Sequence, residues 1–267
     1  MLLGHESLIP SDRVSVPLVK QLIPDGVKPG TIFVVEYDPE SQWLAVATTI
    51  AAHFLLANGR VAYVAMVRSP EDVKYQLEAL GVDVAAAQKD NRLLVDDWFS
   101  ATLTGGRLES AGVQSDFFEP IEGGQRARSL KVADLSIAWL KDAKQGFQPY
   151  DVVETWPPGA LGIGDSYSEG LRFNEENAFV EWMRTRVLPN ERRAKRIHLA
   201  GFVLGIHSES IYKRMENACD GVIDIRVMER DEEAKNLLRV RSLKGQPHDS
   251  RWHEIEIKPN GEAVLAN

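Results

Sequence analysis

The sequence predicts an α/β fold, in which a mostly parallel central sheet is flanked by helices and carries an antiparallel extension at its C-terminal edge. Short β-branched runs alternate with helical patterns over the first hundred residues, as in strand–helix–strand units with right-handed crossovers. Strand-like runs separated only by turns follow residue 220. A chain of 267 residues can bury one large core, so we expect a single domain over residues 1–267.

The first predicted unit follows the turn residues Lys28-Pro29-Gly30. Residues 31–35 are β-branched or aromatic and bounded by turn residues, which indicates a buried strand. Apolar side chains then recur at helical spacing from Ser41 to Ala57, and Asn58-Gly59 ends the pattern. This part of the chain therefore predicts a strand, a loop and a helix.

The second predicted unit repeats this order. Residues 61–67 form a strand-like run, and Ser69 is the expected cap of a helix that has Pro70 at its first position. Gly81 closes this helix. The later elements are expected as strands at 92–95, 160–163, 197–205, 221–227, 237–242 and 252–257, helices at 129–144 and 175–188, and a surface insertion at 101–128, or about 98–130.

Charge and composition limit the classes of partner. There are 31 basic and 39 acidic side chains, a net charge of −8, which opposes the phosphate neutralisation on which nucleic-acid binding depends. The basic run Arg192, Arg193, Lys195 and Arg196 is expected to complement a helix C-terminus and face solvent. Cys219 is the only cysteine and no long apolar run occurs, so we expect a cytoplasmic protein without a disulfide or a membrane anchor.

Four segments in order resemble the KaiC-like branch of RecA-fold ATPases, of archaeal type. They are the strand Gly30-Thr31-Ile32-Phe33-Val34-Val35, the strand and helix Tyr63–Asp72 continuing through Leu77–Asp83, the segment Ala218-Cys219-Asp220-Gly221-Val222-Ile223, and Arg239-Val240-Arg241-Ser242-Leu243-Lys244-Gly245. The resemblance spans roughly residues 15–260 apart from the insertion. It implies a RecA-like P-loop NTPase fold, and it implies assembly, because members of the family stack through the edge that carries Lys244.

The phosphate-binding loop of the family is degenerate in this chain. A P-loop needs G-x-x-x-x-G-K-[ST], because its glycines expose backbone N–H groups, its lysine neutralises phosphate and its hydroxyl holds Mg²⁺. The corresponding positions read Tyr37, Asp38, Pro39, Glu40, Ser41, Gln42, Trp43 and Leu44. Glu36, Asp38 and Glu40 are expected to repel a polyphosphate. We further expect Tyr37 and Trp43 to fill the site, and Glu40 or Ser41 to accept from the helix N-terminus.

The carboxylates that the family uses in catalysis are also fewer in this chain. The family places glutamates directly after the second strand to activate water, but those positions are Val67 and Arg68, neither of which is a general base. The magnesium-linked aspartate of the family corresponds to Asp165, although a carboxylate that caps a loop explains that residue equally well. Glu154 is a rival placement that the downstream spacing disfavours.

Other candidates have structural explanations beside the functional ones. His207, Ser208 and Glu209 follow a predicted strand at its carboxyl end, where α/β folds place their sites, but Ser208 can equally cap a helix. The remaining residues considered for a metal are His248, Asp249 and His253 near Trp252, for which alternation along an edge strand is the simpler account. Lys244 and Arg68 are candidate interface residues.

The sequence therefore predicts a non-catalytic RecA-fold protein that regulates or scaffolds, with no cofactor at its vestigial nucleotide site. Its expected partner is another copy or a RecA-fold paralogue. Two alternatives remain: an ATPase with an atypical phosphate site that uses Arg68 or Lys244 across an interface, and a recombination accessory protein that contacts DNA through Arg107, Arg126, Arg128 and Lys131. The acidic balance counts against the second alternative.

Overall fold

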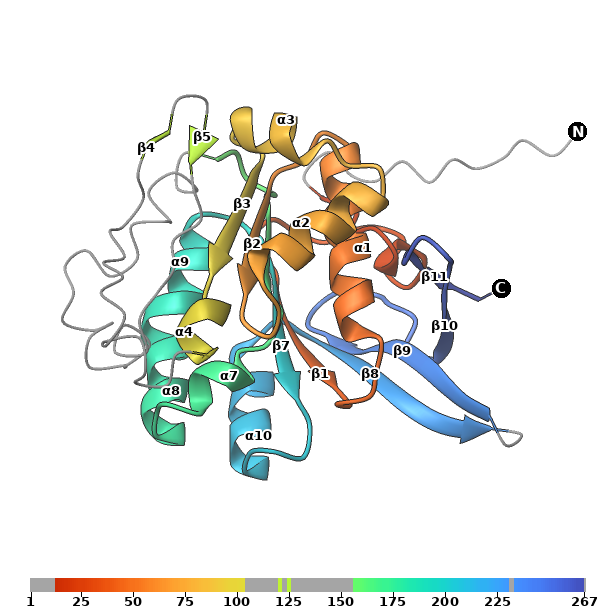
Figure 1. The fold of residues 1–267 in the computed structure, drawn as a ribbon. Helices are drawn as coiled ribbons and strands as arrows, with labels where there is room; N and C mark the ends of the chain where they lie inside the picture. The colour runs from red at the N-terminus through yellow and green to blue at the C-terminus, as the bar shows by residue number, and fades with distance from the viewer. Residues whose placement is uncertain (1–12, 104–119, 122–123, 126–155, 231–232, 267) are drawn as a thin grey trace, which may run out of the picture.

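A computed structural model describes residues 13–103, 120–121, 124–125, 156–230 and 233–266 (Figure 1). Its main sheet has nine strands in the order β11-β10-β9-β8-β1-β7-β6-β2-β3. These strands are β1 (Ile32–Tyr37), β2 (Val61–Ala65), β3 (Leu93–Asp97), β6 (Leu161–Gly164), β7 (Ile197–Val203), β8 (Gly221–Arg230), β9 (Glu233–Leu243), β10 (His253–Ile257) and β11 (Ala263–Leu265). A separate hairpin pairs β4 (Pro120–Ile121) with β5 (Gly124–Gln125).

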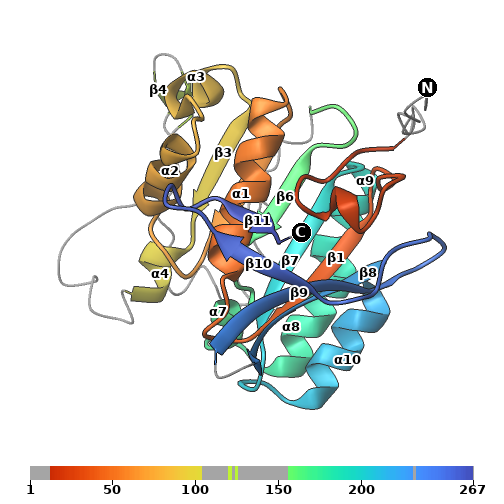
Figure 2. The ribbon, with the colours of Figure 1, turned by 90° about the vertical axis from the view of Figure 1, so that its right-hand side faces the viewer.

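The pairing of the strands confirms the predicted fold class. From β8 through β1, β7, β6 and β2 to β3, each neighbouring pair is parallel. The pairs β8–β9, β9–β10 and β10–β11 are antiparallel, as expected for a C-terminal extension. This extension bends back to the helix α1 (Trp43–Leu56), where the Ala263 N–H donates to Thr49 Oγ1 at 2.8 Å (Figure 2).

Helices cover both faces of the parallel strands. The helices α1, α2 (Pro70–Ala79) and α3 (Val84–Lys89) pack on one face, together with the short helix η1 (Val19–Gln21). The other face carries α7 (Ser168–Leu171), α8 (Glu176–Trp182), α9 (Leu188–Arg193) and α10 (Glu209–Ala218). A further helix, α4 (Phe99–Leu103), follows β3. A hydrophobic core lies on each face of the sheet. Side chains of β1 alternate between these two cores, because successive residues of a strand point to opposite faces.

Local signals located the first two helices well. The Ser69 side chain accepts from the Asp72 N–H at 3.1 Å and Pro70 is the first residue of α2, which confirms the predicted cap. Gly81 follows α2 with a φ of +88° and Asn58 follows α1 with a φ of +62°, the left-handed conformation in which helices commonly end. These helix ends are confirmed within one or two residues.

The helix predicted at 175–188 is longer than expected. It continues from α8 through a π-helical turn at Met183–Val187 into α9, with Pro189 in the first turn of α9. A proline has no N–H to donate to the preceding turn, and a π-helical turn lets the helix continue past that missing bond. Arg192 and Arg193 therefore lie in the last turn rather than after the helix.

The solvent-facing interpretation of the basic run is wrong for Arg196. Its side chain is 2% exposed and donates from Nε and Nη2 to the two carboxylate oxygens of Glu191, at 2.8 and 2.9 Å. The same carboxylate lies 3.5 Å from His198 Nδ1, and His198 Nε2 lies 3.2 Å from the Tyr167 hydroxyl. A buried charged set thus anchors the end of α9 to β7.

Some predictions fall outside the described residues. They are the helix at 129–144, Glu154, and most of the insertion at 98–130, of which only α4, β4 and β5 are described. Within the described ranges, no helix is long and apolar enough to cross a membrane.

Candidate functional site

The candidate site lies at the carboxyl ends of β1 and β6, where the loop Asp38–Gln42 connects β1 to α1. Trp43 begins α1, and its side chain is turned into the protein, leaving 1% exposed. Tyr37 ends β1, is 6% exposed, and its ring centroid lies 5.9 Å from that of Trp43. Two aromatic side chains therefore occupy the space at the start of α1.

Both aromatic side chains bind the main chain of Asp165. The Trp43 indole Nε1–H donates to the Asp165 carbonyl at 2.7 Å, and the Tyr37 hydroxyl approaches the same oxygen at 3.4 Å. The strand β7 separates β1 from β6 in the sheet, so these contacts cross over it. Gly201 of β7 leaves the room, since a Cβ there would lie 2.4 Å from the Asp165 carbonyl and 2.8 Å from the indole nitrogen.

The N-terminus of α1 does not receive the acceptor that we predicted. The Gln42 N–H donates to Asn236 Oδ1 of β9 at 2.9 Å, and Gln42 itself makes no side-chain cap. Glu40 is exposed, and the buried Ser41 hydroxyl has no hydrogen-bond partner among the described residues. The expectation that Glu40 or Ser41 caps this helix is therefore wrong, because an amide from the antiparallel extension reaches the loop instead.

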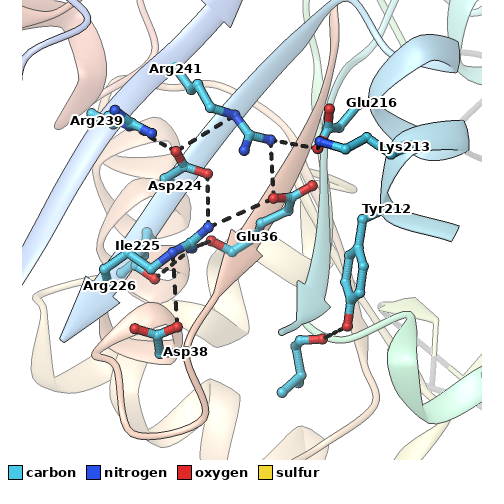
Figure 3. A network of polar contacts seen from close by, with 11 residues as sticks. Glu36, Asp38, Tyr212, Lys213, Glu216, Asp224, Ile225, Arg226, Arg239 and Arg241 are labelled. Carbon is cyan, nitrogen blue, oxygen red and sulfur yellow. Dashed lines mark hydrogen bonds and ion pairs between the residues drawn. The ribbon is translucent and has the colours of Figure 1, made fainter. Parts of the chain in front are cut away.

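Two of the three acidic residues near the loop, Asp38 and Glu36, are paired, which corrects the electrostatic part of the prediction. Asp38 accepts from the Val227 N–H at 2.9 Å and lies 3.9 Å from Arg226. Glu36 points to the opposite face of the sheet, where Arg241 donates to it at 3.1 Å (Figure 3). Repulsion of a phosphate by Glu36 and Asp38 should therefore be weaker than expected.

Asp165 directly follows β6, at the end of a core strand as predicted. Its side chain is fully buried, and Oδ1 accepts from the Met66 N–H at 2.8 Å. Burial raises the pKa of Asp165 to about 7, although the charge of Arg68 and backbone N–H groups act against the rise. A carboxyl group held this way carries a proton over part of the neutral range.

Arg68 is fixed inside the chain between α1, α2 and β2. It is 8% exposed and donates to the Tyr63 hydroxyl at 2.7 Å and to the Leu44 carbonyl at 3.1 Å. It also contacts Thr48 Oγ1 and Gln76 Oε1. The guanidinium would have to leave all of these partners to reach another subunit, so its burial counts against the expected interface role.

Lys244 lies apart from the other predicted site residues. It follows β9 and is exposed, and its Nζ donates to the carbonyls of Asn217 and Cys219 at 2.8 and 2.6 Å, at the end of α10. Beside it is a pocket of about 450 Å³ that Lys28, Gly30, Arg192 and Asp220 also line. This pocket is at the amino ends of β1 and β8, whereas Tyr37, Trp43 and Asp165 meet at the carboxyl ends.

The remaining candidates have partners of their own. Ser208 precedes α10 as a cap would, but its hydroxyl donates to Glu176 at 2.5 Å rather than accepting from the helix, so the capping prediction is wrong. Burial lowers the pKa of His207. Asp249 binds Arg251 at 2.7 Å and His253 at 3.3 Å. Among the residues that the structure describes, no cluster of three or more His, Cys, Asp or Glu could hold a metal ion.

Comparison with solved structures identifies the fold. The chain is similar to the KaiC-like protein PH0186 from the hyperthermophilic archaeon Pyrococcus horikoshii OT3, with a TM-score of 0.62 and 14% sequence identity over 97% of this chain and 100% of the other. No protein-family model matches the sequence, and no curated protein does. The chain therefore has a KaiC-like fold of the RecA type.

Proposed function

We propose that this chain is a non-catalytic KaiC-like domain that acts by binding, as a regulatory or scaffolding partner of a second copy or of a related RecA-fold subunit. One observation carries the proposal: Trp43, at the position where the resemblance puts the phosphate-binding lysine, is buried and donates its indole N–H to the Asp165 carbonyl. The residue that would bind phosphate in an active relative is here part of the packed interior.

A polyphosphate at this position would need space, backbone N–H donors and a cation. To make space for a polyphosphate, the Trp43 ring would have to leave a site where it is 1% exposed. Exposing an aromatic ring of that size costs several kcal/mol. Arg68, a cation that contacts α1 through the Leu44 carbonyl, is held by that carbonyl and by the Tyr63 hydroxyl. These costs support a domain that neither binds nor hydrolyses a nucleoside triphosphate.

The binding surface that we propose is the edge around Lys244. Three cationic side chains, Lys28, Arg192 and Lys244, line the pocket there beside one carboxylate, Asp220. The whole chain carries a net charge of −8, so this local excess of positive charge is complementary to the general surface of a second copy or of another acidic subunit. Exposed charges of this kind favour encounter and orientation more than tight affinity.

Calorimetry with ATP and Mg²⁺ tests the loss of nucleotide binding. We expect no binding by the wild type and none by Trp43→Lys, because that change restores a cation but neither the glycines nor the hydroxyl. A phosphate-release assay is expected to show no hydrolysis of ATP above the buffer rate. Micromolar binding by either protein would show that the pocket can open and would overturn the proposal.

Sedimentation velocity tests the binding role. We expect the sedimentation coefficient to rise with concentration, or on addition of a RecA-fold paralogue. The rise should be smaller for Lys28→Glu, which reverses a charge that lines the pocket but lies outside the strands of the sheet. Lys89→Glu, at the far end of α3, is the matched control. A monomer under all of these conditions would leave the binding role without support.

A further inference from the structure

A second group of ionisable side chains lies on the α10 face of the sheet, away from Trp43. Glu36 of β1, Glu216 of α10 and Arg241 of β9 meet there (Figure 3), and we call them the Glu36 cluster. The group joins three elements that are distant in sequence. None of these side chains has a part in the proposed binding edge.

A β-bulge places Arg241 in the cluster. Val222 of β8 pairs with Ser242 and the next residue, Ile223, pairs with Val240, so Arg241 is left without a partner in the ladder. A bulge bends its strand and redirects a side chain. Here the redirected guanidinium lies between β1 and α10.

Two carboxylates share one nitrogen of this guanidinium. Arg241 Nη2 donates to Glu36 Oε2 at 3.1 Å and to Glu216 Oε1 at 2.8 Å. The side chain of Glu36 is 3% exposed, and its second oxygen, Oε1, is buried without a hydrogen-bond partner among the described residues. A buried carboxylate oxygen without a donor is costly, and a proton on the carboxyl pair would reduce that cost.

The two arginines that pair with Glu36, Arg226 and Arg241, are shared with other carboxylates. On β8, Asp224 takes hydrogen bonds from Arg226 and from Arg239 of β9, at 3.1 and 2.8 Å, and Arg226 lies 3.8 Å from Glu36. On α10, Lys213 is 3.6 Å from Glu216 and 61% exposed, so solvent screens it. The charged or titratable groups that face Glu36 from all packed elements are Asp38, Tyr212, Lys213, Glu216, Asp224, Arg226, Arg239 and Arg241.

The electrostatic balance agrees with a bound proton. Burial raises the pKa of Glu36 to about 7, the charge of Arg241 acts against the rise, and the charge of Glu216, a hydrogen bond with it, and the charge of Asp224 add to it. Two interacting carboxyl groups release their protons in steps that belong to the pair.

We propose that the Glu36 cluster is a proton-dependent clamp on α10: one proton shared by Glu36 and Glu216 holds the helix against β1 and β9, and loss of that proton loosens the helix. When the proton leaves, two adjacent carboxylates compete for one nitrogen of Arg241, with Asp224 nearby. Repulsion between them then acts across the contact between α10 and the sheet. Lys244 binds the carbonyls at the end of the same helix, so loosening α10 also reaches that edge.

Hydrogen exchange of the full chain, read by mass spectrometry and corrected for the intrinsic effect of pH, tests the clamp. We expect the opening equilibrium of residues 209–218 to rise about fivefold between pH 6 and pH 8 in the wild type, below the limit of about tenfold that release of one proton with a pKa of about 7 permits over this interval. In Glu36→Gln, which keeps the hydrogen-bonding shape without the charge, the rise should disappear.

Two further variants make the test decisive. Glu216→Gln changes the partly exposed member of the pair, and it should also abolish the rise, because Glu36 then has Arg241 to itself. Glu209→Gln removes an exposed carboxylate of the same helix and should leave the rise intact. A flat wild-type profile, a rise that persists in both cluster variants, or its loss in Glu209→Gln would each overturn the clamp.

Discussion

Two neighbouring residues of β1 lead to opposite kinds of environment. Tyr37 points to the α1 face, where it meets Trp43 in an apolar, aromatic site. Glu36 points to the α10 face, where charged side chains from β8, β9 and α10 surround it. At the carboxyl end of one strand, aromatic packing therefore covers one face, and ionisable side chains cover the other. Of these two residues of β1, only Glu36 should make the stability of the protein depend on pH in the neutral range.

Loss of the Trp43 ring should destabilise the protein more than any other change considered below. Trp43→Ala should lower the free energy of unfolding by about 4 kcal/mol, because it removes a buried aromatic ring and leaves a cavity. Urea titration at pH 6 and pH 8 should give the same loss at both values. Trp43→Phe keeps most of the ring but not the hydrogen bond to Asp165, and should cost about 1–2 kcal/mol. Equal losses in the two variants would refute the role of the ring itself.

A third buried group, Glu191 with Arg196 and His198, lies at the far end of β7, and its pH dependence has the opposite sign to that of Glu36. Burial works to raise the pKa of Glu191, but the charge and hydrogen bond of His198 and those of Arg196 outweigh it and hold the pKa at about 2. A carboxylate whose pKa falls on folding contributes stability above its unfolded value, near 4.5, and loses that contribution as the pH drops toward 2.

Glu191→Gln should therefore cost about 3 kcal/mol at pH 7, where Arg196 is left buried without its carboxylate. The loss should shrink below about pH 4.5, because the unfolded wild type takes up a proton there while the folded carboxylate, with a pKa of about 2, is still ionised. Guanidinium titration at pH 7 and pH 3 measures both values. Glu181→Gln, which changes an exposed member of ion pairs on α8, is the control and should change stability by less than about 1 kcal/mol.

Local sequence signals account for what could be predicted. The cap at Ser69, the breaks at Gly59 and Gly81 and the β-branched strands depend on residues a few positions apart, and alignment with the P-loop placed Trp43 at the start of α1. The contacts that complete the site join distant positions. Asn236 reaches Gln42 across 194 residues and Arg241 reaches Glu36 across 205, so no local pattern marks them.

Two features had a sequence signal that remained ambiguous. Glu191 precedes Arg196 by five residues, yet a basic run near a helix end usually faces solvent, and only packing against β7 selects one member for burial. Gly201 interrupts an apolar strand, which can indicate close approach by another group. The sequence does not say which group, because the indole of Trp43 and the carbonyl of Asp165 come from other elements.

The smallest expected effects come from the two carboxyl groups whose pKa values burial raises to about 7, Glu36 and Asp165. A carboxyl group whose pKa rises on folding contributes stability below its unfolded value, near 4, and this contribution is lost as the pH rises through 7. Glu36→Gln and Asp165→Asn stay neutral, so each should be more stable than the wild type at pH 8 by about 1 kcal/mol, and neither should gain at pH 5.

The two groups lie on opposite sides of the sheet, since Asp165 interacts with Arg68 and Tyr63 on the α1 face. Their effects should therefore add in the double variant. Thermal unfolding between pH 5 and pH 8 measures the slopes. A double variant that keeps the wild-type slope would show that neither carboxyl group holds its proton in the folded protein, and the contrast between the two faces of β1 would then be one of packing alone.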